Sequence, residues 1–158
     1  MTPITPCLWF AGDGERAADF YTSVFPDSRV VGTTAYGPDN PGGMPEGSVM
    51  TVEFEINGRP FVALNGGPEF TFSEAISFQI ACDSQEEADR YWDVLGEGGE
   101  FGPCGWLKDK FGLSWQVFPA ELTTLIADPD PQRAQRAMQT MLQQSKIDIA
   151  AIRAAADG

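Results

Sequence analysis

The chain has 158 residues, of which 23 are acidic, 10 are basic and none is histidine, so its net charge is −13. This charge repels phosphate backbones and anionic lipid, and we therefore expect neither nucleic acid nor a membrane surface as a partner. No apolar run approaches the ~20 residues that cross a bilayer, and residues 1–6 lack the basic start of a signal peptide. Three cysteines at unrelated spacings predict no disulfide framework, which favours a cytoplasmic location.

Hydrophobic periodicity in the first half of the chain predicts one helix among several strands. Ala17, Phe20, Tyr21 and Val24 recur at the spacing of a helical face, and Pro26 ends that pattern. The predicted strands cover residues 4–10, 28–36, 49–56 and 59–65. Between the second and third of these strands, the Gly- and Pro-rich segment 37–47 predicts a loop that is long enough to form a lid.

The second half of the chain predicts the same order of elements. They are a strand at 75–81, a helix ending at 95, a short strand near 101, and strands at 106–108 and 113–118. Asp83 or Ser84 is placed to cap the helix. Composition then changes, and helices are predicted at 132–144 and 147–156. We expect this extension, residues 120–158, to pack against the body or against a second subunit.

An internal repeat links the two halves. At an offset of 70 positions, residues 11–25 align with 81–95, with identities at Ala11, Asp13, Ala18, Asp19, Tyr21 and Val24. Such a repeat indicates one supersecondary unit built twice. The predicted fold class is therefore α+β, with tandem βαβββ modules at about 1–68 and 74–119 in one domain of residues 1–119, followed by a helical tail.

Several segments give this arrangement a family resemblance. They are ITPCLWF at 4–10, ADFY at 18–21, VFP at 24–26, ALNGGP at 63–68, GPCGWLKD at 102–109, GLSWQ at 112–116 and KIDIAA at 146–151. In these segments the chain resembles the PhnB-like branch of the vicinal oxygen chelate superfamily, also called the glyoxalase/bleomycin-resistance/dioxygenase fold. The resemblance implies cupped mixed sheets that enclose a cavity, and a homodimer. The branch is often labelled 3-demethylubiquinone-9 3-methyltransferase, but the sequence lacks the Gly-x-Gly turn with a following acidic residue that is typical of a dinucleotide cradle.

Metal-dependent members of this superfamily place His or Glu on the first and last strand of each module. Carried over to this chain, those positions fall near Pro6, near Ala63, near Ser77 and on Gln116. None of these residues is an imidazole, a carboxylate or a thiolate, the groups that hold a catalytic divalent ion. We therefore expect no metal site and no cofactor. Carboxylates such as Glu53 on a strand are the alternative ligands, and alternation with apolar neighbours favours a solvated strand face for them.

The end strands predict a ligand cavity lined by neutral polar side chains. On these strands, small or amide-bearing residues alternate with large apolar residues, and under the resemblance the polar face is the cavity face. The predicted ligand-binding residues are Phe10, Ala63, Asn65, Ser77, Gln79, Trp106, Ser114 and Gln116. Amides and hydroxyls of this kind supply hydrogen bonds without charge, which suits a small polar or aromatic ligand. The alternative is that these side chains meet solvent on an open sheet face.

These observations favour a metal-independent, small-molecule-binding protein of the PhnB-like type, acting as a homodimer. One alternative is a superfamily enzyme, a lyase, isomerase or dioxygenase, with a nonstandard site. Another is an interaction module whose C-terminal helices carry the partner surface. Covalent catalysis by Cys104 is disfavoured, because the chain has no histidine to activate a thiol. The methyltransferase label finds no support in the sequence.

Overall fold

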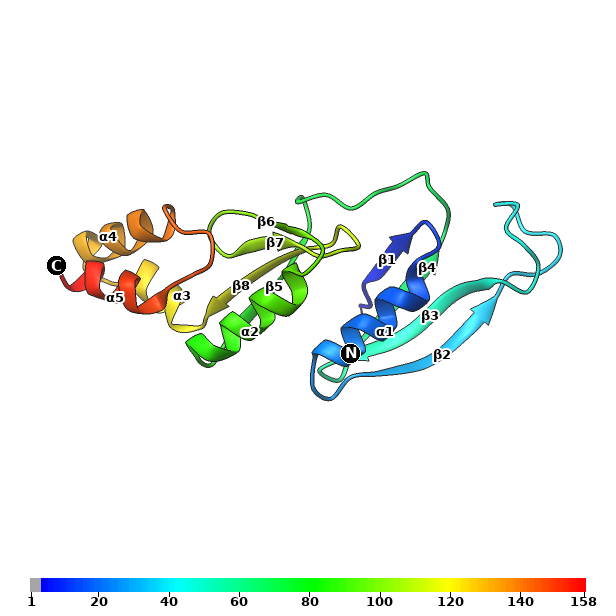
Figure 1. The fold of residues 1–158 in the computed structure, drawn as a ribbon, viewed down its shortest axis with the longest axis horizontal. Coiled ribbons are helices and arrows are strands. Elements are labelled where there is room, and N and C mark those ends of the chain that lie inside the picture. Colours follow the sequence, from blue (N-terminus) through cyan, green and yellow to red (C-terminus); the bar gives the residue numbers. More distant parts are fainter. Residues whose placement is uncertain (1–3) are drawn as a thin grey trace. The chain divides into compact units, whose positions relative to one another are not determined.

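The computed structural model describes residues 4–158, so residues 1–3, part of the segment inspected for a signal peptide, lie outside the described residues. The chain forms two compact units, Met1–Phe72 and Ser73–Gly158, and Figure 1 shows the elements of each. No helix in residues 4–158 is long and apolar enough to cross a membrane.

The first unit is a four-stranded sheet with one helix on it. Its elements are β1 (Cys7–Phe10), α1 (Gly14–Val24), β2 (Arg29–Ala35), β3 (Val49–Ile56) and β4 (Arg59–Asn65). The strand order is β1-β4-β3-β2, and β1 and β4 run parallel while the other neighbours run antiparallel. Buried side chains of α1, including Tyr21, pack against the apolar face of β3, where Phe54 is buried.

The second unit repeats this topology. Its elements are β5 (Ser77–Cys82), α2 (Gln85–Gly96), β6 (Glu100–Phe101), β7 (Trp106–Lys108) and β8 (Ser114–Pro119). The strand order is β5-β8-β7-β6, and β5 and β8 form the parallel pair. Each unit thus has the order βαβββ with the same pairing, so the tandem modules and the α+β fold class expected from the repeat are confirmed.

Side chains fix the ends of several elements. The Ser84 hydroxyl accepts a hydrogen bond from the Glu87 backbone N–H, which makes Ser84 the cap of α2. At the turn between β7 and β8, the buried Asp109 carboxylate accepts bonds from the backbone N–H groups of Phe111 and Leu113, at 2.8 and 3.1 Å, and from Trp115 Nε1 at 2.8 Å. This carboxylate therefore holds the turn against β8.

The helical tail packs on the second unit. Its helices are α3 (Glu121–Ile126), α4 (Pro131–Met141) and α5 (Ile149–Asp157). They share an apolar cluster that includes Phe118 from the end of β8 and Ile152 from α5. Before α5, the carbonyls of Gln144 and Ser145 accept bonds from the backbone N–H groups of Cys104 and Gly105, both at 2.8 Å. The segment that enters α5 is therefore bonded to the loop between β6 and β7.

Some predicted boundaries differ from the observed ones. The strand expected at 4–10 begins at Cys7, and Ile4 is 93% exposed rather than buried. The strand expected at 75–81 begins at Ser77, and Ile76 is also exposed. In both cases a pairing register with the parallel partner starts only at the later residue, so the preceding apolar side chain has no sheet to pack on.

Candidate functional site

The second sheet has one face under α2 and an opposite face that carries most of the predicted ligand-binding residues. Strand register places Ser77, Ser114, Lys108 and Glu100 in one cross-strand row, and Gln79, Gln116 and Trp106 in the next row. The residues that alternate with them are apolar and lie on the opposite face, where the rings of Phe78 and Trp115 contact each other. We call the surface formed by these two rows the polar face.

Three of the predicted polar side chains on this face bind one another. Gln116 Nε2 donates to the Ser77 hydroxyl at 2.8 Å, and Gln79 Nε2 donates to Gln116 Oε1 at 3.4 Å. The amides are therefore paired within the protein, and they do not depend on a ligand for their hydrogen bonds. They form a neutral platform on β5 and β8.

Ser114 differs from these neighbours. It is only 1% exposed, and its hydroxyl oxygen has no hydrogen-bond partner within residues 4–158. A buried hydroxyl left without a partner costs about 1–3 kcal/mol. Such an atom in a sheet that otherwise satisfies its polar groups marks a position where a further hydrogen-bonding group can be accommodated.

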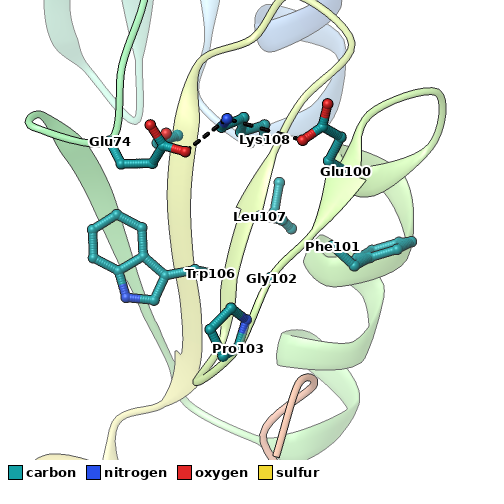
Figure 2. A pocket seen from close by; sticks show the side chains of 9 residues that line it. Glu74, Glu100, Phe101, Gly102, Pro103, Trp106, Leu107 and Lys108 are labelled. Atoms are coloured by element: carbon teal, nitrogen blue, oxygen red, sulfur yellow. Dashed lines mark ion pairs between the residues drawn. The ribbon is translucent and has the colours of Figure 1, made fainter.

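A pocket of about 340 Å³ lies beside Ser114, at the β6–β7 side of the sheet (Figure 2). Its lining residues are Glu74, Glu100, Phe101, Gly102, Pro103, Trp106, Leu107, Lys108 and Ser114. Stacking on Trp92 of α2, with ring centroids 4.8 Å apart, holds the Phe101 ring. The pocket therefore has apolar walls and a small number of polar groups, which is typical of small-molecule sites.

The charged groups of the pocket centre on Lys108. Its Nζ lies 2.7 Å from Glu74 Oε1 and 3.9 Å from Glu100 Oε2. The hydrogen bond from Lys108 holds the pKa of the Glu74 carboxyl below its usual range, and the same bond raises the pKa of Lys108. Both groups are therefore charged at neutral pH, and the ammonium lies between two carboxylates.

Three predicted residues of the first unit lie on the helix side of their sheet, and their role in ligand binding stays a prediction. Phe10, Ala63 and Asn65 are 4%, 0% and 3% exposed. Asn65 Oδ1 accepts a bond from the backbone N–H of Gly14, the first residue of α1, at 2.8 Å, and Asn65 Nδ2 donates to the Val49 carbonyl at 3.1 Å. The first N–H groups of a helix have no partner within the helix. Asn65 supplies that partner, so its face of β4 turns toward α1.

Sequence reasoning missed most of the pocket. It had placed Trp106 and Ser114 at the site, and Lys108 shares their face because it pairs with Ser114 in the β7–β8 register. The alternation of Trp106, Leu107 and Lys108 could have indicated this. Glu74 precedes β5 and carries no periodic signal, so its approach to Lys108 emerges only from the structure.

The superfamily's metal positions do not fit a divalent ion in this chain. Ala63 is fully buried and its side chain offers no ligand atom, and Ser77 and Gln116 offer only neutral oxygens, which lie in hydrogen bonds with polar neighbours. Glu53 is exposed, and Glu55 pairs with Arg29 at 2.9 Å. Within residues 4–158, no group of three or more His, Cys, Asp or Glu side chains is arranged to hold a metal ion. Neutral serine and glutamine oxygens alone do not provide the anionic or imidazole ligands that such an ion needs.

Comparison with known proteins places this fold in a family. The model of the 3-demethylubiquinone-9 3-methyltransferase family matches residues 2–118. The PhnB protein of Bacillus cereus is 34% identical, with a TM-score of 0.65 over 75% of this chain and 100% of that protein. Comparison with curated proteins gives no match.

Two more distant structures share the fold. Protein PA1353 from Pseudomonas aeruginosa is 22% identical, with a TM-score of 0.60 over 73% of this chain and 95% of that one. The fosfomycin resistance protein FosX from Mesorhizobium loti is 17% identical, with a TM-score of 0.55 over 80% of this chain and 97% of that one. The chain belongs to the 3-demethylubiquinone-9 3-methyltransferase family, to which the PhnB-like resemblance of its sequence also pointed.

Proposed function

We propose that this protein binds a small organic molecule in the pocket beside Ser114, without a metal ion. The observation that carries the proposal is the pocket itself, an apolar recess of about 340 Å³ next to a buried hydroxyl without a partner in the described chain. Small-molecule sites have volumes of ~300–1,000 Å³ and combine apolar walls with a few polar groups. The pocket lies at the lower end of that range, so the ligand is small.

Metal independence is the second part of the proposal. It is supported by the chemistry of the residues at the family's metal positions, where Ser77 and Gln116 bind each other instead of presenting anionic donors. Selection of the ligand then depends on the shape of the pocket and on hydrogen bonds from its walls.

The family's description names a methyltransferase, and the fold also occurs in enzymes. Catalysis is therefore the alternative that the experiment has to distinguish from ligand binding alone. A fold alone does not determine an activity. In the pocket, the groups available for proton transfer are Glu74, Glu100 and Lys108, and these are engaged with one another in ion pairs. We therefore propose binding rather than catalysis as the primary function.

We also propose that the protein acts as a homodimer in the cytoplasm. The homodimer is what the family resemblance implies. The cytoplasmic location is supported by the cysteines, because Cys7, Cys82 and Cys104 all lie within the described chain and none forms a disulfide.

Native mass spectrometry of protein purified without additives, combined with elemental analysis, tests the proposal. We expect a dimer that carries or takes up a small organic ligand and contains no stoichiometric transition metal. Trp106→Ala, which removes an aromatic wall of the pocket, is expected to lose that ligand. The matched control is Trp9→Ala in the first unit, which is expected to retain it. Stoichiometric metal, or retention of the ligand by Trp106→Ala, would overturn the proposal. Saturable binding of S-adenosylmethionine would support the methyltransferase activity instead.

A further inference from the structure

The ion pair between Lys108 and Glu74 crosses the strand that carries Ser114. Lys108 lies on β7, Ser114 is its direct partner on β8, and Ser77 on β5 is the next partner in the row. Glu74 precedes Ser77, on the far side of β8 from Lys108. To reach Glu74, the Lys108 side chain therefore extends across β8 at Ser114, and Figure 2 shows the two charged groups meeting in front of that strand. Ser114 therefore lies in the sheet between Lys108 and the strand that Glu74 precedes.

We propose, building on the function proposed above, that the pocket takes a small aromatic or otherwise apolar carboxylate. The anionic group of this ligand replaces the Glu74 carboxylate beside Lys108 and accepts a hydrogen bond from the Ser114 hydroxyl. In the unliganded protein, Glu74 thus takes the ligand's place as the partner of Lys108, but it forms no hydrogen bond with Ser114. The apolar body of the ligand lies against Trp106 and the other apolar walls.

The accessibility of the three groups favours displacement of Glu74. The Glu74 side chain is 59% exposed and lies outside the strands, whereas that of Lys108 is 34% exposed and projects from β7. An exposed ion pair is screened by water and contributes little to stability, so exchanging one carboxylate for another has a small cost. The incoming carboxylate also gives Ser114 the hydrogen bond that it lacks, and a hydrogen bond to a charged group is stronger than one between neutral groups.

A cationic ligand fits the same groups less well. Glu74 and Glu100 lie 2.7 and 3.9 Å from the Lys108 ammonium, so a ligand cation would have to displace a lysine anchored in the sheet. The strongly negative net charge disfavours anions over most of the protein surface. Among the residues lining the pocket, Lys108 provides the positive charge, so a ligand anion would be held there.

Three aromatic probes of one shape and different charge test this inference: 2-naphthoate, 2-naphthamide and 2-naphthylmethylammonium. Calorimetric titration of the full chain at neutral pH is expected to show that the acid binds about tenfold more tightly than the amide, because only the acid forms an ion pair with Lys108. Glu74→Gln removes the competing carboxylate and is expected to increase the affinity for the acid several-fold. The matched control is Glu86→Gln, the same change of charge at an exposed position on α2, which is expected to leave it unchanged.

Two further variants identify the groups that bind the anion. Lys108→Met keeps the apolar stem and is expected to reduce affinity for the acid to that for the amide. Ser114→Ala is expected to weaken binding of the acid more than that of the amide. Three results would overturn this inference and leave the proposed binding function standing. They are equal affinity for the acid and the amide, a higher affinity for the amine than for the acid, and a lower affinity of Glu74→Gln for the acid. Failure of all three probes to bind would overturn the inference and also count against the pocket as a ligand site.

Discussion

Replacing Ser114 by alanine should make the unliganded protein more stable, although the residue lies at the proposed site. Its hydroxyl is buried, and it has no hydrogen-bond partner in the described part of the chain. Folding therefore removes this group from water without providing a replacement bond. Ser77, in the same cross-strand row, has the opposite environment, because its hydroxyl accepts a 2.8 Å bond from Gln116 Nε2. The two serines thus form a matched pair with opposite expected outcomes.

The magnitudes follow from these environments. An unsatisfied buried hydroxyl costs about 1–3 kcal/mol, and a satisfied neutral hydrogen bond contributes about 0.5–1.5 kcal/mol. We expect Ser114→Ala to raise the free energy of unfolding by about 1 kcal/mol, at the lower end of that cost, because loss of the oxygen also leaves a small void. Ser77→Ala should lower the free energy of unfolding by about 1 kcal/mol, because it removes the partner of Gln116.

Urea unfolding followed by circular dichroism measures both changes. For a slope of about 1–3 kcal/mol per M urea, a change of about 1 kcal/mol moves the midpoint by about 0.3–1 M. Thermal unfolding should show shifts of about 2–4 °C in the same directions. A midpoint for Ser114→Ala at or below that of the unmodified protein would refute the reasoning, because it would mean that the hydroxyl is already satisfied in the unliganded protein.

Three other predictions concern positions outside the pocket. Asp109→Asn should lower the free energy of unfolding by about 1–3 kcal/mol, because one carboxylate oxygen becomes an NH2 group that faces an N–H now donating to that oxygen. An unchanged urea midpoint would contradict this. Gly14→Ala should lower the Tm despite alanine's higher helix propensity, since a Cβ there would lie 2.7 Å from Asn65 Oδ1; a higher Tm would contradict it. Burial raises the pKa of the Cys82 thiol to about 12, so a thiol reagent at neutral pH should label exposed Cys7 and spare Cys82. The Cys82 thiol ionises at a lower pH in the unfolded chain than in the folded protein. The contribution of Cys82 to the free energy of unfolding should therefore be fully present below the pKa of the unfolded thiol, and it should fall as the pH rises toward 12. Equal labelling of the two cysteines, or no loss of stability in that range, would contradict this account.

The sequence was sufficient to predict the order of elements in the two βαβββ modules and one face of the second sheet. Alternation of Ser77 and Gln79 with Phe78 placed the two polar residues on the same side, and the structure brings them together with Gln116. Their role in ligand binding stays a prediction. Such alternation is readable because it reflects the pleat of a strand, which depends on local geometry.

Features that depend on packing between elements could not be predicted. Alternation in β4 separated Ala63 and Asn65 from their apolar neighbours but did not reveal which side faces α1, because the need of Gly14 for an acceptor arises only once the helix is docked. The short helix α3 (Glu121–Ile126) was also missed, since six residues give too little periodicity. The approach of Glu74 to Lys108 depends on how the segment before β5 packs beside the sheet.

A crystal structure of the protein with 2-naphthoate, grown in the presence of a metal chelator, would test the central claim most directly. We predict that the probe's carboxylate lies within hydrogen-bond distance of Lys108 Nζ and Ser114 Oγ, with its rings against Trp106 and Glu74 displaced. A probe bound elsewhere on the protein would contradict the account. A metal ion that stays bound in the presence of the chelator, coordinated by side chains of the polar face, would also contradict the account, because recognition there is assigned to shape and hydrogen bonds.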